Sequence, residues 1–106
     1  ASDGDAWGRL IQSGGASVNL PQDGSAVLTA GRWHHLSYVA DGSNYNLYVD
    51  GVYKKQIAYD GTIQSLDTLF IGTQASEEWD GQIDEVRLYN RALSLDEIKR
   101  LYNGGR

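Results

Sequence analysis

The sequence predicts an antiparallel β-sandwich that ends in one short helix, and two kinds of pattern support this prediction. Short runs rich in Trp, Leu, Tyr and Val alternate with glycine and aspartate along most of the chain. Such runs, bounded by the pairs Asp41-Gly42 and Asp50-Gly51, are typical of antiparallel strands joined by tight turns. Near the C-terminus a helix-start pattern takes over, so a single helix is expected there.

Several short segments are predicted to be strands because apolar and aromatic residues recur in them between turn residues. Short strands at this regular spacing indicate a β-sandwich rather than a helical or a parallel α/β fold. The predicted strands are Trp7–Ile11, Ser17–Leu20, Ala26–Thr29, Trp33–Ala40, Tyr45–Asp50, Val52–Tyr59, Thr68–Gly72 and Gln82–Tyr89.

The predicted helix begins at Ser94, which is a favourable N-cap residue. Glu97 stands three residues later, which completes a capping box. Leu93 and Ile98 are placed to form a hydrophobic staple across the cap, and Gly104 fits the end of the helix. The helix is therefore expected to pack on the sandwich as a lid or clasp.

Composition limits what this chain can be. Its 106 residues argue for one domain, and a net charge of −5 without any basic run makes nucleic acid an improbable partner. No apolar stretch approaches the roughly 20 residues that span a bilayer, so no membrane span is expected. Cysteine is absent, which excludes disulfides and thiolate metal sites. Because the chain starts at Ala1 and has no methionine, it is expected to be a processed product or a fragment.

Three motifs resemble those of the laminin G-like, concanavalin A-like lectin/glucanase family. They are Trp33-His34-His35 at the start of a strand, the strand that ends in Asp50-Gly51, and the run DGQIDEVRLYNRALSLDEI from Asp80 to Ile98. The resemblance implies an all-β, antiparallel jelly-roll-type β-sandwich with one short C-terminal helix. Residues 1–106 are then expected to be a single laminin G-like domain that lacks some N-terminal strands of the family.

The resemblance also implies a function, because members of this family are mostly non-catalytic and extracellular. We expect an extracellular or cell-surface module that binds polysaccharide or cell-surface glycan and is appended to a larger secreted protein. Two alternatives stay open: a protein–protein adhesion or structural domain, and a glycosidase or polysaccharide lyase on the same fold. Adhesion and glycan binding are not separated by the sequence.

An enzyme on this fold would need a pair of carboxylates, and the sequence does not supply one. Glycoside hydrolysis uses two acidic groups about 5–9 Å apart, a spacing that positions i and i+2 of one strand provide. Asp84 has Gln82 and Val86 at those positions, and Glu85 has Arg87, which would lower its pKa. No catalytic residues are therefore assigned, and the chain is predicted not to be an enzyme.

The two histidines, His34 and His35, are adjacent in the sequence. Neighbours on a strand point to opposite faces, so these two are not expected to bind one metal ion together. The expected arrangement has one histidine packed or hydrogen-bonded and the other exposed to water.

Trp79, Trp7 and Tyr45 are the candidate ligand-binding residues, because an aromatic ring can stack on a sugar ring. Trp79 stands in a polar turn, where it could equally cover a sheet edge. Trp33, at the start of its strand, is expected in the core.

Asp84 is the candidate metal ligand. In the resembling family an aspartate of the Ile-Asp-Glu-Val strand often helps to hold a structural calcium ion, and Asp84 is the matching position. The family's other ligands come from its N-terminal region, for which Asp3 and Asp5 could substitute. The expected cofactor is thus a structural calcium ion at most.

The strand Trp33–Ala40 is apolar on both faces, and such a strand needs cover on both. Two arrangements would supply it. The chain pairs with a second copy or another polypeptide, which is the favoured option, or residues 1–30 rebuild a compact small sandwich.

Overall fold

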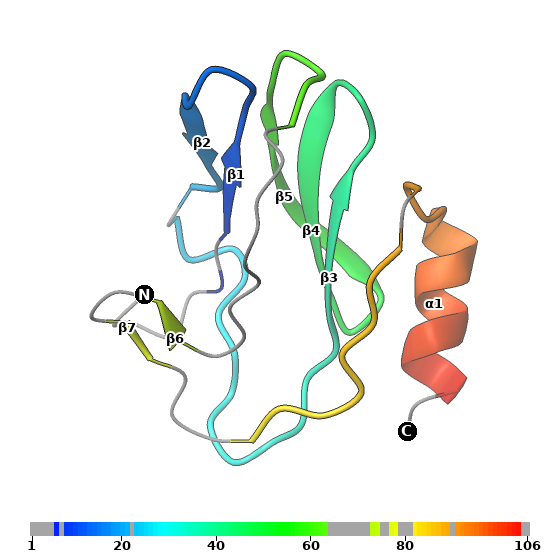
Figure 1. The fold of residues 1–106 in the computed structure, drawn as a ribbon. Coiled ribbons are helices and arrows are strands. Elements are labelled where there is room, and N and C mark those ends of the chain that lie inside the picture. Colours follow the sequence, from blue (N-terminus) through cyan, green and yellow to red (C-terminus); the bar gives the residue numbers. More distant parts are fainter. Residues whose placement is uncertain are drawn as a thin grey trace.

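Strands make up most of the regular structure, and one helix follows them near the C-terminus (Figure 1). The computed structural model describes residues 6, 8–21, 23–63, 73–74, 77–78, 82–89 and 91–104. In chain order the elements are β1 (Arg9–Ile11), β2 (Ser17–Asn19), β3 (Leu36–Ala40), β4 (Asn44–Val49), β5 (Val52–Ala58), β6 (Thr73–Gln74), β7 (Glu77–Glu78) and α1 (Leu95–Gly104).

The strand pairs in the described part of the chain are all antiparallel, which confirms the predicted fold class. β1 pairs with β2, β3–β4–β5 form the central sheet, and β6 pairs with β7. The central sheet stands between the β1–β2 hairpin and α1, which lie on its opposite sides (Figure 1). The predicted strands Tyr45–Asp50 and Val52–Tyr59 are confirmed to within one residue at each end as β4 and β5.

The turn between β3 and β4 is built by Asp41, as its Asp-Gly sequence predicts. The Oδ1 atom of Asp41 accepts hydrogen bonds from the backbone N–H of Asn44 at 2.8 Å and of Ser43 at 3.0 Å. Both bonds lower the pKa of Asp41, and the bond from Asn44 has the larger effect. Gly42 follows with φ of 97°, a left-handed conformation that a residue without Cβ adopts freely.

The core lies between the β1–β2 hairpin and one face of the central sheet. Alternate residues of β4 point to this face, where they meet side chains from the N-terminal part of the chain. The cluster consists of Leu10, Leu20, Ala26, Tyr45, Leu47 and Val49. Among the described residues, the N-terminal part of the chain therefore supplies about half of this core, as the compact arrangement requires.

The hairpin approaches the central sheet closely at Gly8. A Cβ atom on Gly8 would stand 2.7 Å from the hydroxyl of Tyr45 and 2.8 Å from the ring of Tyr38. Lys55 of β5, only 4% exposed, donates from Nζ to the backbone carbonyl of Pro21 at 2.6 Å. A glycine and a buried, hydrogen-bonded lysine thus hold the two layers together.

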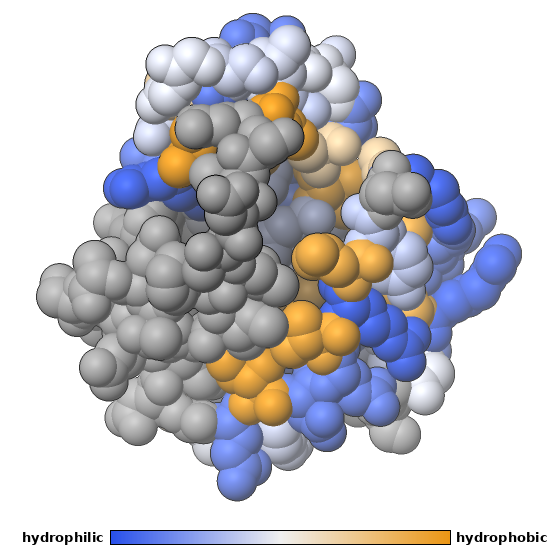
Figure 2. Space-filling model, viewed as in Figure 1, coloured by the Kyte–Doolittle hydropathy of each residue, from blue (hydrophilic) through white to orange (hydrophobic). Residues whose placement is uncertain are grey.

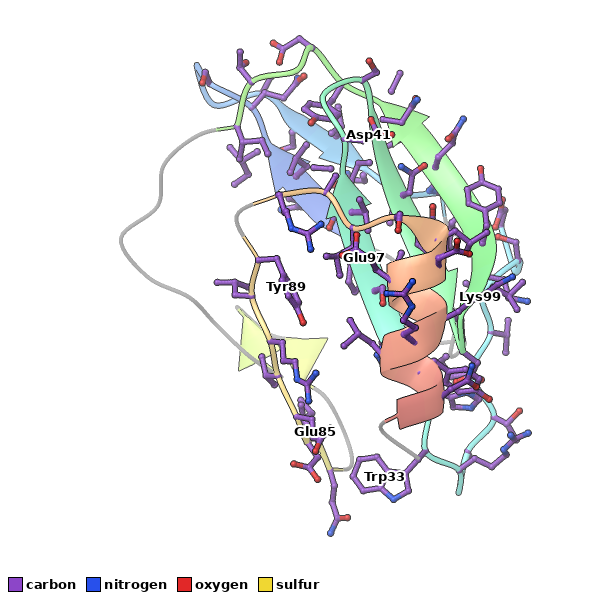
Figure 3. The ribbon with its side chains drawn as sticks, turned by 90° about the vertical axis from the view of Figure 1, so that its right-hand side faces the viewer. Trp33, Asp41, Glu85, Tyr89, Glu97 and Lys99 are labelled. Carbon is purple, nitrogen blue, oxygen red and sulfur yellow. The ribbon has the colours of Figure 1, made fainter. Side chains whose placement is uncertain are left out.

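The opposite face of the central sheet is covered by α1 (Figures 1 and 3). Val39 and Asn46 are opposite one another in the β3–β4 register and are buried on this face. Ile98 of α1 is fully buried. The N-terminal hairpin and α1 of the same chain therefore cover the two faces of the central sheet.

Trp33 is not in the core, and this prediction is wrong. Trp33 is 63% exposed and precedes β3, which begins only at Leu36. His34 and His35 are instead held by contacts with the β4–β5 turn, among them a backbone hydrogen bond of 2.7 Å from the Asp50 N–H to the His35 carbonyl.

Two further predicted strands are not formed. In Ala26–Thr29 a single isolated bridge occurs at Val27, and Asp23 folds the preceding residues into a turn by accepting from the Ser25 N–H at 3.0 Å. In Gln82–Tyr89 no strand is assigned, since Glu85 has φ of 54°, which interrupts an extended backbone. The predicted strand Thr68–Gly72 lies outside the described residues.

The helix start is confirmed in detail. The Glu97 N–H donates to Ser94 Oγ at 3.2 Å, and the Ser94 N–H donates to Glu97 Oε1 at 3.0 Å. This reciprocal pair is the predicted capping box. α1 has ten residues. Within the described ranges no helix reaches the length and apolar character that a membrane crossing requires.

Candidate functional site

A hollow of about 230 Å³ opens between α1 and the segment that leads into it. Figure 3 shows Tyr89 on that segment and Glu97 on the helix at the two sides of the hollow. Its lining combines an aromatic ring, two guanidinium groups, one carboxylate and two leucines. These residues are Tyr89, Arg91, Leu93, Glu97, Arg100 and Leu101.

The polar edge of the hollow is a fixed ion pair. Arg91 donates from Nη1 to Glu97 Oε1 at 2.9 Å and from Nη2 to Glu97 Oε2 at 2.5 Å. Glu97 also accepts from Ser94, so the capping box holds its carboxylate in place. These hydrogen bonds lower the pKa of Glu97 to about 2, and the bond from Arg91 has a larger effect than the bond from Ser94. Glu97 is therefore a carboxylate at any ordinary pH and has no proton to give as a general acid.

Arg100 is placed differently from Arg91. It is exposed, and within the described part of the chain no carboxylate lies at ion-pair distance from it. Tyr89, across the hollow, is 46% exposed. Leu93 and Leu101 are partly buried between them. The hollow thus offers a ring face, an apolar floor and a guanidinium group to a ligand.

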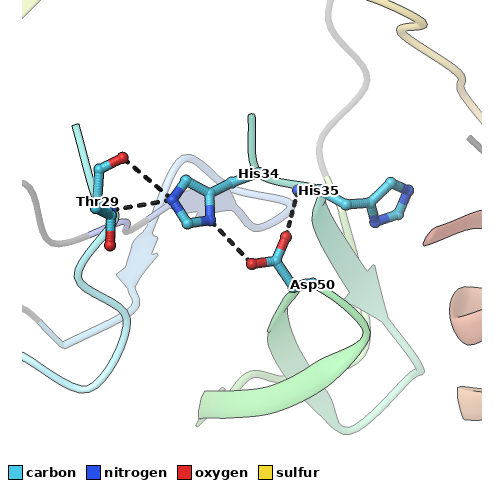
Figure 4. Close-up of polar contacts among 4 residues, drawn as sticks. All are labelled: Thr29, His34, His35 and Asp50. Atoms are coloured by element: carbon cyan, nitrogen blue, oxygen red, sulfur yellow. Dashed lines mark hydrogen bonds and ion pairs between the residues drawn. The ribbon is translucent and has the colours of Figure 1, made fainter. Parts of the chain in front are cut away.

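A second polar cluster joins His34, His35, Thr29 and Asp50 (Figure 4). Asp50 Oδ2 lies 2.9 Å from His34 Nδ1, and Asp50 Oδ1 accepts from the His35 N–H at 2.9 Å. The Thr29 N–H donates to His34 Nε2 at 3.0 Å, and the Thr29 carbonyl oxygen lies 3.3 Å from the same nitrogen. Both nitrogens of His34 are therefore engaged within the protein.

The carboxylate of Asp50 stays ionised because of these contacts. Partial burial by itself raises its pKa, but the hydrogen bonds from the His35 N–H and from His34 outweigh burial and lower it. Asp50 also has φ of 53°, a left-handed conformation that aspartate tolerates better than most residues. The cluster thus clips the β4–β5 turn to residues 34–35, which is a structural role.

The two histidine rings point away from each other, as their adjacency predicts (Figure 4). His34 is the packed, hydrogen-bonded one, with its side chain 11% exposed. His35 was expected to be exposed to water, but it is partly buried, and its ring lies 6.1 Å from that of Tyr102 on α1. This burial lowers the pKa of His35. Among the described residues no group of three or more His, Asp and Glu is arranged to hold a metal ion.

Asp84, the candidate metal ligand, is exposed, and its Oδ1 accepts from the Glu85 N–H at 2.8 Å. Asp3 and Asp5, its candidate partners, lie outside the described residues. Asp84 is thus the one candidate calcium ligand in the described part of the chain, and it does not form a calcium site by itself. Glu85 pairs with Arg87 across 3.7 Å, as the sequence predicts.

The candidate ligand-binding aromatics have different positions. Trp79 and Trp7 lie outside the described residues. Tyr45 is only 9% exposed, and its ring stacks on that of Tyr38 at 6.1 Å. Burial, followed by the neighbouring Tyr38, raises the pKa of Tyr45. A ring enclosed in this way presents no face to a ligand, so Tyr45 has the environment of a core residue.

Sequence reasoning missed the hollow beside α1. One signal was available, since Glu97, Arg100 and Leu101 are spaced three and four residues apart and so share one face of the predicted helix. The other wall was not predictable, because Gln82–Tyr89 was expected to be a strand within a sheet. Only its position alongside α1 brings Tyr89 and Arg91 to that helical face.

A family model described as the concanavalin A-like lectin/glucanases superfamily matches residues 2–99. A crystal structure of an S-layer domain-containing protein from Clostridium thermocellum is similar in fold, with a TM-score of 0.62 and 24% sequence identity. The alignment covers 83% of this chain but only 45% of the other, so the chain spans less than half the length of that structure. No curated protein matches the chain.

Proposed function

The chain belongs to the concanavalin A-like lectin/glucanases superfamily, and from this premise we propose that it is a non-catalytic binding module for polysaccharide or cell-surface glycan. The observation that carries the proposal is the hollow beside α1. Its lining joins the half-exposed ring of Tyr89 to guanidinium and carboxylate groups. Sugar sites combine an aromatic ring, which stacks on the C–H face of the sugar, with a few fixed polar groups for its hydroxyls.

A binding role is preferred to catalysis because of the described carboxylates. Glu97 is held ionised by Arg91, so it cannot serve as a general acid. Asp84 and Glu85 are adjacent and exposed. Asp84 accepts a hydrogen bond from the Glu85 N–H, and Glu85 pairs with Arg87. A glycosidase needs two acidic groups on either side of the scissile bond, one of them with a raised pKa.

An extracellular or cell-surface location within a larger secreted protein is part of the proposal. It is supported by the superfamily, whose laminin G-like members resemble this chain in sequence, and by the S-layer domain-containing protein with a similar fold. Antibody labelling of intact cells that express the full-length protein tests the location.

A glycan array tests the binding function. The purified chain should be retained on one class of polysaccharide and should leave that polysaccharide undegraded. Retention on no glycan at all, together with capture by a purified cell-surface protein, would contradict the proposal.

A second candidate function, adhesion to another protein, is favoured by one observation. Ile83, Val86 and Leu88 are 46%, 52% and 79% exposed along the segment that precedes the hollow. Figure 2 shows hydrophobic atoms gathered over this segment. Exposed apolar side chains that stand together are typical of surfaces that contact proteins.

A further inference from the structure

We infer that the hollow beside α1 binds a sugar that carries a carboxylate, so that the ligand is an acidic polysaccharide with uronic acid units. The inference rests on the proposed glycan-binding function and names its ligand class. It follows from the charge, the shape and the hydrogen-bonding groups of the hollow.

Charge is the first argument. The whole chain has a net charge of −5, yet the lining of the hollow holds two arginines and one glutamate. Glu97 is committed to Arg91 by two hydrogen bonds, so that pair is neutral. Arg100 is left with no ion-pair partner among the described residues, although Asp96 stands one helical turn before it. A guanidinium group prefers a carboxylate or phosphate, which it binds through two parallel hydrogen bonds.

Shape is the second argument. Tyr89 is half-exposed and the two leucines of the lining are partly buried, so one side of the ligand must be apolar. A pyranose ring has such a side in its C–H groups, which stack on aromatic rings. The volume of about 230 Å³ is below the roughly 300–1,000 Å³ of pockets for drug-sized ligands. The hollow therefore suits one sugar unit of a chain that continues over the surface.

Within the described part of the chain, Arg91 has free N–H donors for the hydroxyl groups of the sugar. A guanidinium group has five N–H donors, of which Arg91 gives one from each terminal nitrogen to Glu97. Its other donors are available for ring hydroxyls, and their positions are set by the capping box through Glu97. If the carboxylate of the sugar binds Arg100 and its hydroxyls bind Arg91, the sugar ring is oriented over Tyr89.

The experiment compares two ligands with the same sugar backbone, one with charged carboxylates and one with neutral methyl esters. Tetragalacturonate and its fully methyl-esterified form are titrated into the chain by calorimetry. We expect the acid to bind at least tenfold more tightly than the ester. Arg100→Gln should reduce affinity for the acid about tenfold, equivalent to about 1.4 kcal/mol, and should weaken binding of the ester much less. Tyr89→Ala should weaken both ligands, because stacking does not depend on charge.

Lys99→Gln is the matched control, since it removes one neighbouring positive charge from the same helix. Figure 3 shows Lys99 on the flank of α1 away from Tyr89, and its Cγ lies near the β4–β5 turn, 3.6 Å from a Cβ built on Gly51. This variant should bind the acid as the parent does. Equal losses in Lys99→Gln and Arg100→Gln would overturn the inference, because they indicate attraction to overall charge. Thermal melts of each variant confirm that it is folded.

The inference and the proposed function fail in different ways. Binding of neutral glycans on the array, with equal affinity for the acid and its ester, overturns the acidic ligand and keeps a glycan-binding module. Retention of no glycan of either kind overturns the function itself. Binding of inorganic phosphate as tightly as of tetragalacturonate would also contradict the inference, since phosphate has no apolar face to stack on Tyr89.

Discussion

Asp50 shows how one side chain of this protein joins two parts of the fold. It occupies the first position of the β4–β5 turn with φ of 53°. Its carboxylate also accepts hydrogen bonds from His34 and from the backbone of His35. The turn and the chain before β3 are therefore held by the same residue, which explains why residues 33–35 leave the expected strand.

Replacement of Asp50 should test this clip. We expect Asp50→Ala to lower the free energy of unfolding by about 1–3 kcal/mol, because the His34 ring and the His35 N–H lose their acceptor. Asp50→Asn is the control, since asparagine tolerates the left-handed conformation and keeps an acceptor oxygen. It should lose less than Asp50→Ala. Urea unfolding at pH 7 measures both, and equal stability of parent and alanine variant would contradict the role.

The same residue predicts a pH dependence. The pKa of Asp50 is lower in the fold than in the unfolded chain, where it is about 3.9. Its contribution to stability is therefore complete above about pH 4 and is lost as the pH falls through the lowered pKa. Between about pH 4 and pH 2 the melting temperature of the parent should fall more steeply than that of Asp50→Ala. Parallel curves would rule out Asp50 as a source of this dependence.

Asp84 carries the calcium prediction. We predict weak binding of a structural calcium ion, with Asp84 as one ligand, because it matches a ligand position of the resembling family. Calcium should raise the melting temperature of the parent relative to a chelator, by an amount that Asp84→Asn removes. Identical melts of the parent in calcium and in chelator would eliminate the site.

The stability of α1 as a helix depends on the hydrogen bonds of its first turn. Ser94 and Glu97 satisfy each other's backbone N–H groups, and Arg91 adds two hydrogen bonds from outside the helix. The helix also buries Ile98 completely. Its start is therefore encoded locally, while its position depends on the sheet beneath it.

Ser94→Ala should cost about 1 kcal/mol of the free energy of unfolding, the usual effect of losing an N-cap acceptor. Ser94→Asp keeps an acceptor at the same position and should stay within about 0.5 kcal/mol of the parent. Urea titrations followed by circular dichroism compare the three proteins. If Ser94→Asp lowered the free energy of unfolding as much as Ser94→Ala, the N-cap hydrogen bond would not be what stabilises α1.

Over the whole molecule, the central sheet is covered on one face by the N-terminal hairpin and on the other by α1. Both faces of β3 are thus covered within one chain, as in the compact arrangement. The row Ile83, Val86 and Leu88 is nevertheless exposed on the segment next to the hollow. Apolar side chains exposed together favour association.

Self-association through this row remains a prediction at the scale of the molecule. Sedimentation at rising concentration should reveal a dimer, and Leu88→Glu should shift it toward monomer because a charge would be buried in the contact. Ile63→Glu serves as the control, since Ile63 is also an exposed apolar residue, at 51%, but is not part of this row. A clean monomer with one cooperative melt at all concentrations would exclude obligatory pairing.

The fold class, the Asp-Gly turns and the start of α1 were predictable from the sequence. The class follows from repeated short strand patterns between turn residues, and the turns and the helix start depend on residues only a few positions apart. Aspartate side chains reach the next backbone N–H groups at Asp41, and Ser94 and Glu97 cap each other, whatever the rest of the chain does. Tertiary structure decided the exposure of Trp33, the burial of Tyr45 and the loss of a strand at Glu85. It also decided the hollow, because Tyr89 and Arg100 meet only when the segment before α1 lies along the helix. Burial and side-chain contacts of this kind depend on which distant layers pack together, and local sequence patterns do not specify that.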